Sequence, residues 1–256
     1  MKSHNSTRKA VGKITSTSLS GLIGLLFSFG LSLTLNAQDS ATSTVLDRYG
    51  NLDVERTGPT IDAELGRKML RRGNTYLNLE RYDEAIEEYR KAISADPNLA
   101  EAFRNLANIH LSREDFASAK PMLARFIALQ TDVSAALIAA VQTLGQLERN
   151  DRNYSAAIEY DLRAIALLPN DDSQVHIMAN TYNNAGDQEK AIAIYEAAAD
   201  VQPNNAFFHR SLGRILENQG ELQRALDAYR RAAETDPDSS FYADLVAGLE
   251  QRLSRI

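Results

Sequence analysis

The residues that could take part in catalysis or metal binding in this 256-residue chain are four histidines and scattered acids. The chain contains no cysteine. It therefore has no thiol nucleophile, no thiolate metal ligand and no disulfide. It also lacks a Gly-rich phosphate loop followed by Lys, a His-Glu-x-x-His zinc motif and a Gly-x-Ser-x-Gly nucleophile motif. These absences predict a non-enzymatic protein with no catalytic residue, no metal site and no cofactor.

The four histidines are spread along the chain rather than grouped. His4 belongs to the N-terminal segment, and His110 and His209 occupy positions of a repeating pattern that otherwise carry bulky side chains. We therefore expect His110 and His209 to be packed, and only His176 to face a groove. A single histidine without a positioned carboxylate is more often a polar contact than a general base.

A pattern with a period of thirty-four residues fills residues 66–239 and must position these side chains. It predicts five units, 66–99, 100–133, 138–171, 172–205 and 206–239. Small residues stand in the first half of each unit, at Gly73, Ala107, Gly145, Ala179 and Gly213. Alanine recurs in the second half, at Ala85, Ala119, Ala157, Ala191 and Ala225. Such spacing allows two short helices to approach closely, while larger residues fill the gaps between them.

These columns resemble the tetratricopeptide repeat (TPR) over about two-thirds of the chain. The resemblance implies an all-α fold, a right-handed α-α superhelix of five helix pairs over residues 61–256, closed by a capping helix at 240–256. One interval between units is four residues longer than the others, at Ser134–Leu137. About one helical turn is added there, which predicts a longer helix with an unrotated packing face.

The N-terminal segment has a different composition. Four basic residues precede an apolar run, Leu22–Leu35, and no acid occurs before Asp39. We interpret residues 1–37 as a secretory signal peptide cleaved after Ala37, with an uncleaved membrane anchor as the alternative. Residues 38–60 are predicted to be a flexible linker. This arrangement predicts a periplasmic or secreted protein in a bacterial envelope.

The charge of the chain bounds its partners. The formal net charge is −6 at pH 7, so nucleic acid is not an expected partner. In the TPR family, which the chain resembles, the first helix of each pair lines a concave groove that holds a peptide. Placing that rule on this chain predicts a peptide-binding groove formed by Arg67, Arg71, Asn74, Arg104, Asn105, Asn108, Gln146, His176, Asn180, Arg210 and Arg214.

The predicted groove is rich in arginine and asparagine. Arginine binds carboxylates through two parallel hydrogen bonds, and asparagine can hold a peptide backbone, so we expect a protein or peptide partner of acidic character. Asn74 and Asn105 match two asparagines with which some TPR relatives hold a terminal carboxylate, but Leu70 stands where those relatives have lysine. A competing interpretation is that these polar side chains only keep the surface soluble.

The sequence therefore favours a protein–protein interaction scaffold of the bacterial cell envelope, acting in assembly of an envelope or secretion complex. One alternative is a self-associating structural module that forms homo-oligomers. Another is an accessory subunit that recruits an envelope enzyme. Contact with a membrane is expected only if the N-terminal segment stays uncleaved.

Overall fold

The structure is a computed structural model that describes residues 61–255, and within that range it contains α-helices and no strand. The described residues divide into two compact units, 61–167 and 168–255. The all-α fold predicted from the repeat pattern is confirmed. The predicted signal peptide (1–37) and linker (38–60) lie outside the described residues.

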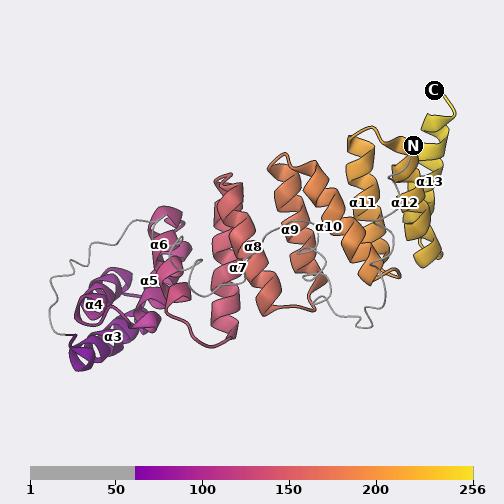
Figure 1. The fold of residues 1–256 in the computed structure, drawn as a ribbon. Helices are drawn as coiled ribbons and strands as arrows, with labels where there is room; N and C mark the ends of the chain where they lie inside the picture. The colour runs from indigo at the N-terminus through magenta and orange to yellow at the C-terminus, as the bar shows by residue number, and fades with distance from the viewer. Residues whose placement is uncertain (1–60, 256) are drawn as a thin grey trace, which may run out of the picture. The chain divides into compact units, whose positions relative to one another are not determined.

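The unit of residues 61–167 is built from three helix pairs (Figure 1). Each helix packs against the next along the chain, from the first pair to the third. The bounds of these helices are α3 (Ala63–Asn78), α4 (Tyr82–Ala95), α5 (Ala100–Ser112), α6 (Phe116–Ala128), α7 (Ala135–Asn150) and α8 (Tyr154–Leu167).

The unit of residues 168–255 contains two helix pairs and a final helix, again packed in chain order. The pairs are α9 (Asp172–Asn184) with α10 (Gln188–Val201), and α11 (Ala206–Asn218) with α12 (Leu222–Thr235). The final helix α13 (Ser240–Leu253) packs on α12 and buries Leu249. The capping helix expected at 240–256 therefore lies at the end of this unit.

Alanine makes the crossing of each helix pair possible. The five alanines of the second-half column, Ala85 to Ala225, are all 0% exposed. Three tyrosines of the second helices, Tyr89, Tyr195 and Tyr229, are almost fully buried beside them. Small side chains at the crossing points and large rings in the gaps give the close packing that the sequence predicted.

The turn inside each pair places one residue in the left-handed region of backbone space. In the unit of residues 168–255 this residue is Gly186 or Gly220, at φ 87° and 80°. In the unit of residues 61–167 it is Glu80, Glu114 or Arg152, at φ 57°, 57° and 61°. These five residues follow the repeat period, so the same turn is made by glycine in one unit and by a charged residue in the other.

The polar residues that follow the prolines cap only some of the helix starts. Asn98, Asp171 and Asn204 are polar residues that follow Pro97, Pro169 and Pro203, and of these Asp171 caps its helix by accepting a hydrogen bond from the Ser173 amide. Asn98 does not cap α5, which begins after Leu99 without a side-chain cap. Asn205 rather than Asn204 caps α11. Boundary shifts of one residue are common where several polar residues follow one another.

The longer interval between repeats has the predicted effect. Helix α7 has 16 residues, whereas the equivalent helix α5 has 13. Its extra turn is capped by Ser134, whose hydroxyl accepts a hydrogen bond from the Leu137 amide at 3.1 Å. Leu137 is buried in the core of the unit, so the added turn extends the apolar face without rotating it.

Candidate functional site

The predicted groove residues lie on the first helices of the pairs, and they differ in exposure. Four of the seven in the unit of residues 61–167 are exposed, two are half-buried and Asn105 is buried. The exposed four are Arg67, Arg71, Asn108 and Gln146. In the unit of residues 168–255, Arg214 is exposed and His176, Asn180 and Arg210 are half-buried. We call these side chains the first-helix face of their unit.

Asn74 and Asn105 are brought together with a core tyrosine. The Asn105 amide donates to Asn74 Oδ1 at 2.9 Å, and the Tyr89 hydroxyl donates to the same oxygen at 2.8 Å. Asn74 in turn donates to Glu101 at 3.3 Å. The two asparagines therefore satisfy one another, and the neighbouring Arg71 and Arg104 are the side chains with hydrogen-bonding capacity to spare.

Ion pairing distinguishes the arginines of the first-helix face from most arginines elsewhere on the helix pairs. Seven of the eleven other arginines of the helix pairs bind carboxylates of the same chain, as in Arg81 with Glu84 and Arg224 with Glu196. The arginines of the first-helix face form no ion pair with any residue in the range 61–255. They are Arg67, Arg71, Arg104, Arg210 and Arg214. The first-helix faces of this acidic protein therefore carry arginines that no carboxylate of residues 61–255 compensates, and these can attract an anionic group.

His176 lies at the centre of a polar cluster in the unit of residues 168–255. Asn180 donates from Nδ2 to His176 Nε2 at 2.8 Å, so the imidazole proton resides on Nδ1, which faces the Tyr195 hydroxyl at 2.5 Å. Burial and the charges of Arg214 and Arg210 lower the pKa of His176 below its ordinary value. Burial raises the pKa of Tyr195 to about 12. His176 is therefore a neutral, hydrogen-bonded ring at neutral pH.

Two phenylalanines border this cluster. The Phe207 ring meets the His176 ring edge-on, with centroids 4.6 Å apart. The guanidinium of Arg210 lies over the Phe241 ring, 5.2 Å from its centroid, and Phe241 is 50% exposed. Phe207, Arg210 and Arg214 are spaced at i, i+3 and i+7, so they share one face of α11.

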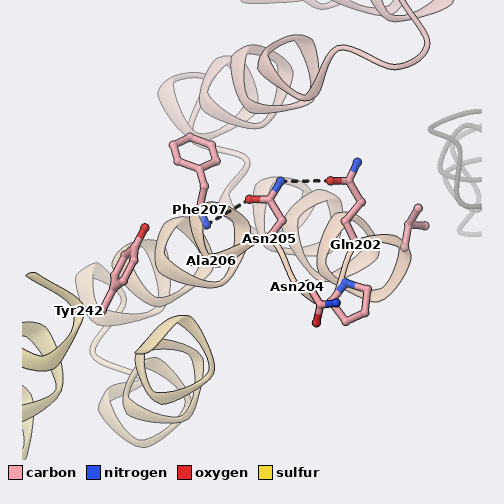
Figure 2. A pocket seen from close by; sticks show the side chains of 8 residues that line it. Gln202, Asn204, Asn205, Ala206, Phe207 and Tyr242 are labelled. Atoms are coloured by element: carbon pink, nitrogen blue, oxygen red, sulfur yellow. Dashed lines mark hydrogen bonds between the residues drawn. The ribbon is translucent and has the colours of Figure 1, made fainter. Parts of the chain in front are cut away.

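An open pocket of about 600 Å³ adjoins the start of α11. Figure 2 shows its lining, in which Phe207 comes from α11 and Tyr242 from α13. Its polar wall is held in place by Asn205, which donates to Gln202 at 3.1 Å and accepts from the Phe207 amide at 3.2 Å. The pocket therefore joins fixed amide groups to two aromatic rings next to the arginines.

Phe241 and Tyr242 were not among the sequence-predicted site residues. One further step of the thirty-four-residue period would have found Phe241, because it stands thirty-four residues after Phe207. The capping helix therefore continues the first-helix face for one more position. The core residues Tyr89 and Tyr195 also belong to the site, because their hydroxyls contact Asn74 and His176.

Within residues 61–255 there is no group of three or more His, Cys, Asp or Glu side chains that could hold a metal ion. None of the helices in that range is long and apolar enough to cross a membrane. His110 and His209, expected to be packed, are 8% and 4% exposed.

Comparison with protein families matches both units. A family model described as TPR repeat matches residues 73–112, and one described as tetratricopeptide repeat matches residues 178–240. Among solved structures, the chain is similar to the crystal structure of the MamA protein, with a TM-score of 0.50 and 26% identity. That match covers 70% of this chain and 96% of MamA.

Two curated proteins are similar over 57% of this chain. One is the tetratricopeptide repeat and J domain-containing co-chaperone DNJ1 of Cryptococcus neoformans, 19% identical over 152 residues. The other is RNA polymerase II-associated protein 3 of Xenopus laevis, 29% identical over 151 residues. The matches cover 29% and 20% of those proteins, so the chain spans less than a third of their length.

Proposed function

The chain is a tetratricopeptide-repeat protein, and from this premise we propose that it is a scaffold that binds a segment of a partner protein on its first-helix faces. TPR scaffolds generally mediate protein–protein interaction and are typically non-enzymatic. The proposed partner segment is acidic, and the proposed setting is the bacterial cell envelope, in assembly of an envelope or secretion complex.

The observation that carries the proposal is the set of five arginines without a carboxylate partner. None of the five pairs with a carboxylate among residues 61–255, whereas seven of the other eleven arginines of the helix pairs do, and this difference favours an external anion for the first-helix faces. Arginine is suited to this task because its planar group binds a carboxylate at two points. The polar neighbours on each face can then fix the orientation of a bound peptide.

The envelope setting is supported by the sequence of residues 1–37. A basic start, an apolar run and the small residue Ala37 before the first acid are typical of a secretory signal. A cysteine-free chain is compatible with that route because it needs no disulfide. Processing can be tested by determining the N-terminal sequence of the protein purified from its host, where a start at Gln38 is expected.

Charge reversal tests the binding face. We expect an Arg71→Glu, Arg104→Glu double variant to lose the partners that the wild-type chain captures from envelope extracts at physiological salt. A matched control is the Arg152→Glu, Arg231→Glu double variant, because both arginines are exposed, pair with no residue in the range 61–255 and lie off the first-helix faces. Unchanged capture by the first variant, or equal loss by the second, would refute binding through the first-helix face.

A further inference from the structure

We propose that the unit of residues 168–255 recognises a two-residue signal, an acidic side chain followed by a large apolar side chain, in an extended segment of the partner. This inference rests on the proposed function, because it assigns the partner chemistry to one face. The acidic side chain binds Arg210 and Arg214, and the apolar side chain enters the pocket bordered by Phe207 and Tyr242.

The two arginines lie on the same face of α11. Arg210 and Arg214 are separated by one turn of α11, and both act electrostatically on the same histidine, His176. Arg214 Nη2 is held by a weak contact to Asn180 Oδ1 at 3.5 Å, while Arg210 rests on the Phe241 ring. Neither guanidinium meets a carboxylate among the described residues, so their remaining N–H groups are available to a ligand.

The cluster beneath the arginines supplies no competing anion. His176 binds both Asn180 and Tyr195, and all three side chains are neutral at neutral pH. Glu217 is the acid closest in sequence to Arg214, and it already binds the Tyr229 hydroxyl and Arg252. Asp172, beside the pocket, accepts hydrogen bonds from Gln202 and Asn205, so neither Glu217 nor Asp172 forms an ion pair with Arg210 or Arg214.

Phe207 and Phe241 connect the arginines of the site to the pocket. Phe207 contacts His176 and also lines the pocket. Phe241, which underlies Arg210, meets the Tyr242 ring at a centroid distance of 5.4 Å, and Tyr242 lines the same pocket. Figure 2 shows Phe207 and Tyr242 projecting from different helices around Ala206. An apolar side chain adjacent to a bound carboxylate therefore has an aromatic-walled recess within reach.

Peptide binding tests the inference with defined probes. Four labelled Gly/Ser-rich peptides would carry Asp-Phe, Asn-Phe, Asp-Gly or Asn-Gly at the centre, and fluorescence anisotropy would measure their binding to the full chain. We expect Asp-Phe to bind at least roughly tenfold more tightly than Asn-Phe, because a charge-assisted arginine contact is lost. Asp-Gly should also bind more weakly than Asp-Phe, because the recess is empty.

Three variants locate the binding. Arg210→Gln should remove the preference for Asp-Phe over Asn-Phe, and Phe207→Ser should remove the preference for Asp-Phe over Asp-Gly. Arg231→Gln is the matched control, because Arg231 is an exposed arginine of α12 without an ion pair among the described residues, and it should change neither preference. Thermal unfolding followed by circular dichroism shows that each variant is folded.

The results separate this inference from the proposed function. Three outcomes overturn the two-residue signal. They are equal binding of the Asp-Phe and Asn-Phe peptides, no binding of any peptide at millimolar concentration, and a loss of preference in Arg231→Gln as large as that in Arg210→Gln. If partner capture still depends on Arg71 and Arg104 in that case, the scaffold function stands without it. If Asp-Phe is preferred through Arg210 but capture ignores Arg71 and Arg104, the signal stands and the wider proposal fails.

Discussion

The ring of Tyr89 lies directly against Gly73. A Cβ atom added to Gly73 would come within 2.5 Å of the tyrosine ring, a distance that side chains do not tolerate. Gly213 and Tyr229 repeat the relationship in the other unit, at 2.6 Å. Gly73 and Gly213 are therefore required by their tyrosine partners.

Replacing Gly73 with alanine tests that relationship. Gly73→Ala should lower the free energy of unfolding by about 1–3 kcal/mol, because the buried ring must move. Gly248→Ala is the control, since it lies in helix α13 with no atom near the added Cβ. That change should raise the free energy of unfolding by about 0.5–1 kcal/mol through helix propensity. Urea unfolding measures both, and effects of the same sign would contradict the packing described.

The left-handed turns give a second prediction. Glu114→Gly should raise the free energy of unfolding by up to ~1 kcal/mol, because glycine relieves ~1–2 kcal/mol of left-handed strain and loses ~0.5–1 kcal/mol to chain entropy. Gly220→Ala at the equivalent turn should be destabilising, because alanine must then adopt φ near 80°. Thermal melting of the two single variants checks the opposite signs. A stabilising Gly220→Ala would show that the turn can relax.

A buried ion pair replaces the tyrosine contact in the third repeat. Asp161 stands where Tyr89 and Tyr195 stand in their repeats, and it binds Arg149, with side-chain exposures of 5% and 14%. Arg149→Leu alone should cost roughly 3 kcal/mol, because it removes a charge partner from a buried carboxylate. The Arg149→Leu, Asp161→Tyr double variant should recover much of that loss by restoring an aromatic residue. A double variant with a lower free energy of unfolding than Arg149→Leu would show that the aromatic ring no longer fits beside Gly145.

Crowding at a helix crossing provides a test of the fold as a whole. Ala191 is 0% exposed, whereas Glu189 lies on the exposed side of the same helix. Ala191→Leu should destabilise the protein by about 1–3 kcal/mol, and Glu189→Leu should cost little. Chemical unfolding of the two variants gives the comparison. Equal losses would mean that residue 191 is not at a crossing.

The histidine of the polar cluster predicts a pH dependence. Since the pKa of His176 is held below its ordinary value of 6.5 by burial and by Arg214 and Arg210, the folded chain binds its proton less readily than the unfolded chain. Its contribution to stability is therefore present above about pH 6.5 and is lost as the pH falls toward the lowered pKa. NMR titration of the imidazole should give a midpoint below 6.5, and Arg214→Gln should raise it. A midpoint at or above 6.5 would exclude the arrangement described.

The repeat pattern predicted the helix pairs because burial of alanine and tyrosine at fixed spacing allows few other arrangements. It could not predict which direction each tyrosine hydroxyl takes. Tyr89 bonds to Asn74, Tyr195 to His176 and Tyr229 to Glu217, in three different columns of the first helix. The choice depends on local neighbours, such as Ala179 in place of glycine, which a periodic pattern does not encode.

The peptide-binding role of the groove residues stays a prediction. The resemblance to the TPR family placed the arginines on the first helices, and within residues 61–255 none of them pairs with a carboxylate. Asn105 was expected to be open to a peptide but is buried against Asn74 and Tyr89, because a short amide side chain can turn inward to a hydroxyl that sequence alone does not locate. The five predicted repeat boundaries remain predictions.

The varied tyrosine hydrogen bonds limit how the repeats can be rearranged. Each ring is matched to a particular residue on the helix before it, so a second helix transplanted from one pair to another would bring a hydroxyl that points at the wrong acceptor. Recombination of this chain with related arrays should therefore succeed when whole helix pairs are exchanged and fail when the exchange point falls inside a pair.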